Sequence, residues 1–278
     1  MIFSLAITWR SALSCMIGVL CLLLSLAALG QITAQLKTSN TELVVEAGLT
    51  TPRLVSLLGP GQIKWENRGS ETLISSVNIS DKDVPVLWKF NRDASQIDER
   101  RVAFVYDCAS PHLRLTWEWK SRESFGPIEH EITIENLDDQ EIWIPMQDSL
   151  VVNWQVDPHS ALEHLFVEKG ADTPSLVGTH LVPIKDGYQW TGTSSTYGDL
   201  SNDQPREIIP WSLIERTNSS SGWYAGIEFS GRTRVSISRS RDSLQVALGL
   251  NPDPGPFRTR LEPGQSFESP VVFLGRIS

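Results

Sequence analysis

Apolar and polar residues alternate at every second position over much of this chain, and this period restricts the fold more than any other feature of the sequence. The pattern is clearest from His112 to Lys120, where Leu113, Leu115, Trp117 and Trp119 alternate with polar residues. A period of two places neighbouring side chains on opposite faces of a β-strand. The segment therefore predicts a half-buried strand.

The same alternation recurs along residues 128–135, and a polar turn at 136–139 leads into 142–144, so these two segments predict a hairpin. Further strands are predicted at 42–46, 53–58, 72–79, 84–90, 102–106, 150–156, 208–215, 223–230, 234–238, 244–250 and 271–274. Regular helices do not separate these strands, which excludes a doubly wound sheet or a TIM barrel as the main architecture. The prediction is an all-β fold, a large antiparallel β-sandwich.

One short helix is predicted near residues 160–169. Ser160 and Glu163 have the spacing of a capping box, Leu162 and Phe166 belong to an apolar stripe, and Gly170 follows as a stop signal.

Residues 11 to 36 carry no charge and follow Arg10, which is the arrangement of a secretion signal. We expect a signal peptide at 1–34, a single sandwich domain at 35–278, and a secreted or periplasmic protein. The alternative is an uncleaved membrane anchor at residues 11–30. After cleavage Cys108 is the one remaining cysteine, which excludes an internal disulfide and predicts a buried thiol.

The charge balance and the missing motifs exclude several classes of function. Lys and Arg number 24 against 33 Asp and Glu, a net charge of −9 without any basic run, so nucleic acid is not an expected partner. Recognisable spacings for a nucleophile elbow, a zinc protease or a phosphate loop are absent, and we predict no catalytic residue, metal or cofactor. His159 and His164 are expected to be surface or capping residues, and His130 a core histidine.

The aromatic and charged residues divide into predicted core and candidate carbohydrate contacts. Trp117, Trp119, Trp143 and Trp154 lie on alternating apolar faces and are predicted to be buried. The candidates for contacting a sugar are two Trp residues in less regular surroundings and two charged residues near a strand end, namely Trp190, Trp211, Glu228 and Arg232. The competing interpretation of Glu228 is a solvated side chain paired with Arg232.

Three segments carry a family resemblance: the run GWYAGIEFSGR at 222–232, the run EIIPW at 207–211, and the segment 261–275 that begins LEPGQSFESP. They resemble the N-terminal region of α-galactosidases of glycoside hydrolase family 36. The resemblance implies a β-supersandwich, related in fold to galactose mutarotases, that precedes a (β/α)₈ barrel holding the catalytic residues. The βα units of such a barrel are not found in this sequence.

The resemblance therefore implies a non-catalytic module of a truncated or split α-galactosidase-like enzyme. Such a module would act in carbohydrate binding, domain docking or oligomer assembly. Its partners would be a carbohydrate of the α-galactoside class, a (β/α)₈ catalytic domain or a second copy of the chain. Two alternatives stay open: a self-sufficient mutarotase-like enzyme that modifies sugars, and a structural envelope protein that shares the fold.

Overall fold

The computed structural model describes residues 31–59, 64–169, 178–194, 207–217, 221–253, 255 and 258–277. Within these ranges the regular secondary structure is β-strand throughout, which confirms the predicted fold class. The strands belong to a compact unit that extends over Thr33–Ser278. The predicted signal peptide falls almost wholly outside the described residues, and the first strand begins at Ile32. No helix in the described ranges has the length and apolar character needed to cross a membrane.

One sheet has eight strands in the order β1-β2-β3-β4-β12-β19-β18-β15. Its strands are β1 (Ile32–Lys37), β2 (Glu42–Ala47), β3 (Pro52–Leu58), β4 (Lys64–Asn67), β12 (Leu150–Gln155), β15 (Gln189–Ser194), β18 (Thr233–Ser240) and β19 (Ser243–Leu250).

A second sheet has ten strands in the order β14-β13-β16-β17-β22-β10-β9-β8-β7, with β21 paired to β10 beside this path. Its strands are β7 (Lys89–Ile97), β8 (Arg101–Ala109), β9 (His112–Lys120), β10 (Ile128–Asn136), β13 (Leu162–Glu168), β14 (Thr179–Ile184), β16 (Ile208–Arg216), β17 (Ser221–Glu228), β21 (Ser266–Glu268) and β22 (Val271–Ile277). A small third sheet has the order β20-β11-β5-β6. It comprises β5 (Ser76–Ile79), β6 (Lys82–Pro85), β11 (Ile142–Pro145) and β20 (Arg258–Leu261).

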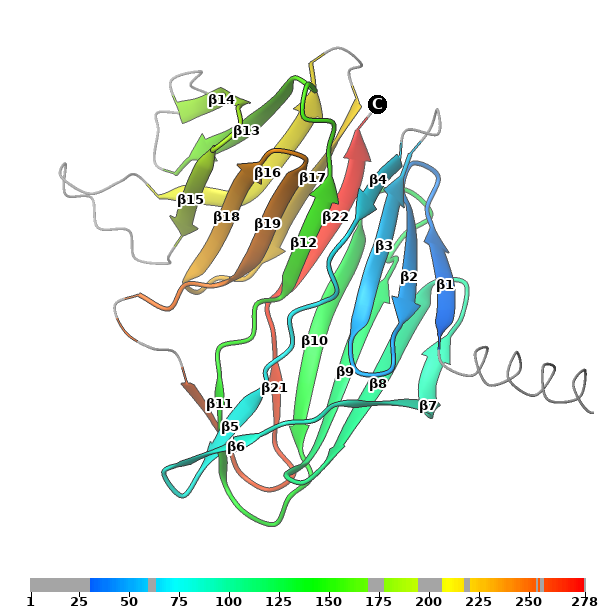
Figure 1. Ribbon diagram of the computed structural model, residues 1–278, viewed down its shortest axis with the longest axis vertical. Helices are drawn as coiled ribbons and strands as arrows, with labels where there is room; N and C mark the ends of the chain where they lie inside the picture. The colour runs from blue at the N-terminus through cyan, green and yellow to red at the C-terminus, as the bar shows by residue number, and fades with distance from the viewer. Residues whose placement is uncertain are drawn as a thin grey trace, which may run out of the picture. The chain divides into compact units, whose positions relative to one another are not determined.

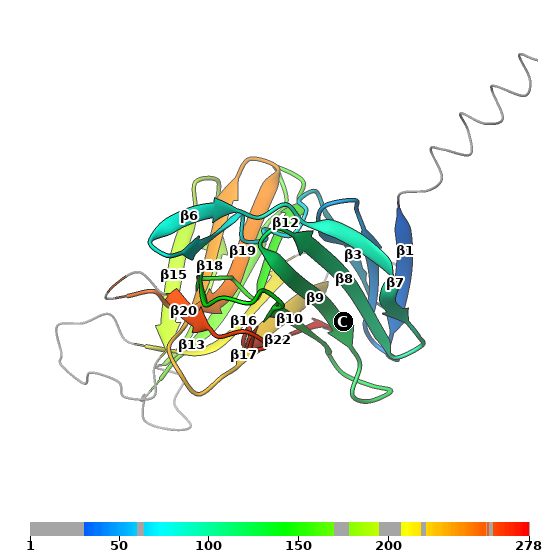
Figure 2. The ribbon, with the colours of Figure 1, turned by 90° about the horizontal axis from the view of Figure 1, so that it is seen from below.

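The two large sheets pack face to face, and the small sheet lies at one end of this sandwich (Figures 1 and 2). Trp65 of β4 and Trp154 of β12 come from the eight-stranded sheet, and Trp223 of β17 comes from the ten-stranded sheet. Their rings meet edge-on or tilted, with centroids 5.8–6.3 Å apart. Because all three side chains are almost fully buried, they form an aromatic joint between the sheets.

Strand β9 has the predicted bounds, and all four of its apolar side chains are buried. Cys108 is also buried, as predicted. Trp143 is an exception among the predicted core tryptophans. Its side chain is 38% exposed and donates a hydrogen bond to Glu141 at 2.9 Å, so its prediction as core is wrong.

The helix predicted at 160–169 is wrong. Residues 162–168 form β13, which pairs with β14 on one side and with β16 on the other. Leu162, His164 and Phe166 also alternate with period two, so the short pattern fits a strand as well as a helix. Pairing with two neighbouring strands decides the outcome.

The predicted hairpin between 128–135 and 142–144 is also wrong. Strand β10 pairs with β9, β21 and β22, whereas β11 pairs with β5 and β20 in the small sheet. The turn after Asn136 therefore carries the chain from one sheet to another. The strand predicted at 84–90 is divided in the same way, because β6 ends at Pro85 and β7 begins at Lys89 in a different sheet.

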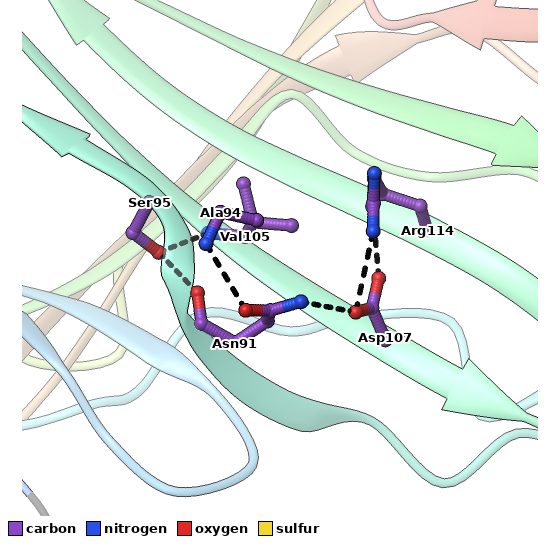
Figure 3. A network of polar contacts seen from close by, with 6 residues as sticks. All are labelled: Asn91, Ala94, Ser95, Val105, Asp107 and Arg114. Carbon is purple, nitrogen blue, oxygen red and sulfur yellow. Dashed lines mark hydrogen bonds and ion pairs between the residues drawn. The ribbon is translucent and has the colours of Figure 1, made fainter.

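Strand β7 lies at the edge of the ten-stranded sheet and contains an irregularity between Asn91 and Gln96 (Figure 3). Asn91 bonds Asp107 and accepts from the backbone N of Ala94 at 3.1 Å, while Ser95 Oγ accepts from the backbone N of Val105 at 2.9 Å. Partial burial raises the pKa of Asp107, but hydrogen bonds from Arg114 and Asn91 hold it below its usual value. A bulged, charged edge of this kind discourages pairing with a strand of another molecule.

Candidate functional site

A groove with a volume of about 560 Å³ lies where the end of β17 and the starts of β18 and β20 meet. Its lining comes from four separate segments of the chain: Phe229, Gly231, Arg232, Leu250, Asn251, Pro252, Asp253, Gly255, Arg258, Phe267, Glu268 and Pro270. The volume is in the range of sites that take small ligands.

Backbone pairing between β18 and β19 sets the shape of this groove. Thr233 pairs with Leu250, and the backbone N of Asn251 donates to the carbonyl of Arg232 at 3.1 Å. The guanidinium of Arg232 then donates to the carbonyl of Asp253 at 2.7 Å, which fixes the loop that follows β19. Arg232 is therefore both a wall of the groove and the anchor of one of its loops.

The lining combines aromatic surface with charged groups. Phe229 is 47% exposed and offers a ring at the groove, whereas Phe267, which also lines the groove, is buried. Arg232, Arg258 and Glu268 supply donors and acceptors. An exposed ring beside a few charged groups suits a ligand with one apolar face and many hydroxyl groups.

A second hollow of about 510 Å³ is lined by Lys64, Glu66, Gln155, Val156, Asp157, Pro158, Arg241 and Asp242. It contains no aromatic side chain among its described lining residues. The groove beside Phe229 is therefore the better candidate for binding a sugar ring.

The structure brings one of the four predicted contact residues, Arg232, into the groove. Glu228 lies just before Phe229 but is outside the groove lining, and it accepts from Arg122 Nη2 at 2.9 Å. Arg122 also forms an ion pair with Glu129. The partner of Glu228 is therefore Arg122 rather than Arg232.

The two predicted tryptophans lie elsewhere in the fold. Trp190 is part of β15, not of a loop, and its ring lies 4.5 Å from that of His164 and 4.8 Å from that of Phe166. Trp211 is half-buried on β16, opposite Gly226 of β17. Neither residue belongs to the groove lining.

His130 is a core residue, as the sequence predicts. Its imidazole stacks on Trp119 with centroids 4.4 Å apart, and Nδ1 donates to the carbonyl of Glu118 at 2.6 Å. Burial lowers its pKa to about 3. The side chain is therefore neutral at physiological pH and does not reach the groove.

His164 is buried rather than at the surface, so its prediction as a surface or capping residue is wrong. Its two ring nitrogens contact Tyr188 Oη at 3.0 Å and Ser212 Oγ at 3.1 Å, and burial lowers its pKa to about 4. Across the described ranges, no group of three His, Cys, Asp or Glu side chains could hold a metal ion.

Four residues that line the groove are not predicted as contacts from the sequence: Phe229, Arg258, Phe267 and Glu268. Phe229 continues the apolar face of Trp223 and Ile227, so its period predicts burial, but β17 ends one residue earlier. The Ser230-Gly231 turn that follows was the available signal for an exposed strand end. No sequence pattern around residues 258 and 267–270 predicts that they lie beside this turn.

Comparison with known proteins gives similarity in structure alone. No protein-family model matches the sequence, and no curated protein matches it significantly. Among solved structures, the GH36 α-galactosidase AgaA from Geobacillus stearothermophilus aligns with a TM-score of 0.66 at 13% identity. The α-galactosidase from Lactobacillus brevis also aligns with a TM-score of 0.66, at 12% identity. Both alignments cover 89% of this chain and 40% of the enzyme.

A galactose mutarotase-like protein from Lactobacillus casei aligns with a TM-score of 0.55 at 12% identity, over 89% of this chain and 100% of its own length. The resemblance drawn from 222–232 and 261–275 is thus confirmed as a likeness of fold. This chain has the galactose mutarotase-like β-sandwich fold, which it shares with two-fifths of the length of GH36 α-galactosidases.

Proposed function

We propose that this chain is the non-catalytic sandwich module of an α-galactosidase-like glycoside hydrolase, and that the groove beside Phe229 binds a carbohydrate. The observation that carries the proposal is the groove itself, in which an exposed aromatic ring lies beside Arg232, Arg258 and Glu268. Structures of AgaA variants in complex with raffinose and stachyose make α-galactosides the first ligands to test.

The absence of catalysis is inferred from where the most perturbed ionisable groups lie. Active sites commonly contain groups with strongly shifted pKa values. Among the described residues, the carboxyl of Glu71, whose pKa burial raises to about 8, and the imidazole of His130 are both in the core. Neither lines the groove, so the proposal assigns binding rather than bond cleavage to the groove.

The experiment is a titration of the purified chain with raffinose, followed by calorimetry, together with an assay of p-nitrophenyl α-galactoside hydrolysis. We expect binding without hydrolysis. Phe229→Ala should weaken binding about tenfold, the equivalent of about 1.4 kcal/mol of ring contact. Phe125→Ala is the matched control, because Phe125 is 68% exposed and outside the groove. Turnover by the pure chain, or equal affinity in both variants, would contradict the proposal.

A catalytic partner follows from the same proposal. This chain spans 40% of the length of the α-galactosidases that it matches, so hydrolysis would require a (β/α)₈ domain, joined or separate. Adding such a domain should produce a complex in analytical ultracentrifugation. A self-associated species without it would instead indicate that the sandwich assembles oligomers.

The second candidate is a self-sufficient mutarotase-like enzyme, and the alignment over the whole length of the Lactobacillus casei protein favours it. Polarimetry of freshly dissolved galactose tests this candidate directly. If the chain accelerates mutarotation and His130→Ala does so equally, the buried histidine is not the catalytic group. If the chain does not accelerate mutarotation, this candidate is removed.

We also propose that the chain is exported, because residues 11–36 are uncharged and follow Arg10. Amino-terminal sequencing of the protein from its native host tests this. A start between residues 31 and 35 supports cleavage, whereas an intact Met1 in the membrane fraction supports the anchor at 11–30.

A further inference from the structure

The side chain of Arg276 in β22 is buried, and it has no hydrogen-bond partner among the residues that the structure describes. The residue is 3% exposed, and its Nε, Nη1 and Nη2 atoms contact no acceptor. Its backbone N is satisfied, since it donates to Thr41 Oγ1 at 3.1 Å. A buried guanidinium without a counter-charge or an acceptor is strongly unfavourable, so an anion bound beside this group would stabilise the folded protein.

Strand register shows which way Arg276 points. It lies opposite Trp223 of β17, which in turn lies opposite Ile214 of β16. Directly paired residues share a face of the sheet, and Trp223 and Ile214 are both buried between the sheets. Arg276 therefore points into the sandwich. Gly59, the residue that follows β3, lies against this side chain, because a Cβ added at Gly59 would lie 2.5 Å from Nε of Arg276.

A second guanidinium lies on the same face. Arg216 is two residues beyond Ile214 on β16, and its Cζ atom is 4.6 Å from the centroid of the Trp65 ring. This contact holds the half-buried side chain by a cation–π interaction. Among the described residues no carboxylate forms an ion pair with Arg216 or Arg276, although the charge of Asp157 acts on Arg216.

The two arginines influence each other. Burial, together with the positive charge of Arg216, lowers the pKa of Arg276 to about 10. Burial also lowers the pKa of Arg216, and Asp157 opposes that shift. Two like charges held together on a low-dielectric face create a local positive potential that attracts an anion.

We infer that Arg216 and Arg276 form a binding site for a doubly charged tetrahedral oxyanion, of the phosphate or sulfate class, between the two sheets at the ends of β16 and β22. Each guanidinium presents a planar fork of N–H donors that matches two oxygens. Two guanidinium groups that each bond two oxygens need more oxygens than the two of a single carboxylate. An anion with two negative charges also balances the two positive charges. This inference is independent of the sugar groove and does not rest on the proposed function.

The test is thermal unfolding of the full-length chain in sodium phosphate, sulfate or acetate, with chloride added to equalise ionic strength. At one hundred times the Kd, phosphate or sulfate should raise Tm by about 5–10 °C, whereas acetate should leave Tm near its value in chloride. Arg216→Gln should lose most of this shift. Arg68→Gln is the matched control, because Arg68 is an exposed arginine paired with Asp242, and it should keep the shift.

Arg276→Met should fold in chloride alone with a Tm at least equal to that of the unsubstituted chain, and phosphate should no longer raise it. If Arg276→Met does not fold, the half-buried Arg216→Gln still decides the question. Phosphate and sulfate also stabilise proteins because they are excluded from the protein surface. This effect acts equally on Arg68→Gln and Arg216→Gln, so the difference between these two variants reports binding at the site. Equal Tm in phosphate and chloride, a full shift in Arg216→Gln, or a larger shift with acetate would overturn the inference.

Discussion

Trp117 donates a hydrogen bond from its indole Nε1 to Oε2 of Glu71 at 3.2 Å, inside the sandwich. The other carboxyl oxygen of Glu71 accepts from the backbone N of Val151 at 3.0 Å, so the side chain bonds both large sheets. Burial raises the pKa of Glu71 to about 8 despite these hydrogen bonds. The carboxyl is therefore protonated in the folded protein at neutral pH.

This carboxyl should make stability depend on pH. Its folded pKa of about 8 is above its ordinary value of 4.5, so between these values the folded state binds the extra proton. The stabilising effect is complete below pH 4.5 and is lost progressively as pH rises from 4.5 through 8, a change of about 5 kcal/mol. Urea unfolding of Glu71→Gln should lack this decline. The quantity to compare is the slope of the unfolding free energy against pH. The absolute stability is a poor readout, because the introduced amide would face the indole donor of Trp117.

His130 should make the protein less stable as pH falls, which is the opposite of the effect of Glu71. Its folded pKa of about 3 is below the ordinary 6.5, so the unfolded chain binds a proton first as pH falls. The unsubstituted protein should lose stability from about pH 6.5 down to 3, and His130→Gln should lose less. A parallel decline in both proteins would contradict the buried, neutral imidazole.

The aromatic joint should dominate the stability of the sandwich. Trp65→Ala removes a side chain that is 0% exposed and contacts Trp154 and Trp223, and it should cost about 3–5 kcal/mol of unfolding free energy. Trp143→Ala is the matched control, because that ring is 38% exposed and should cost less than about 1 kcal/mol. Chemical denaturation of both variants measures the difference.

Arg239 should tolerate even a conservative change poorly. Its buried guanidinium donates to the carbonyls of four residues: Asp157, Pro158, Ser160 and Ile184. Lysine cannot reach four acceptors from one nitrogen, so Arg239→Lys should lose about 2–4 kcal/mol of stability. Arg68→Lys, in an exposed ion pair, should change it by less than about 1 kcal/mol. Similar losses in both would show that the four carbonyls find other donors.

The fold was predictable where the local pattern and the final burial agree, as in β9, whose alternating faces survive unchanged in the structure. Prediction failed where pairing partners decide. Residues 162–168 fit a helix by spacing, but pairing with β14 and β16 makes them a strand. Ile142 pairs with Leu261 rather than with the strand that precedes it.

The groove could not be found from the sequence because no local pattern brings its segments together. Arg232 was identified from its place after a strand, yet Arg258 and Phe267 reach it through separate strands of two different sheets. Trp190, another of the four candidates, instead packs against His164.

The position of β22 has a consequence for how this protein is made. This strand follows all the other described strands in the sequence, yet it lies between β10 and β17 in the ten-stranded sheet. Until residues 271–277 leave the ribosome, the β7–β10 and β13–β17 halves of that sheet have no hydrogen bonds to each other. The two halves therefore present unpaired strand edges until β22 has been made, and the ten-stranded sheet closes only when this strand inserts between β10 and β17.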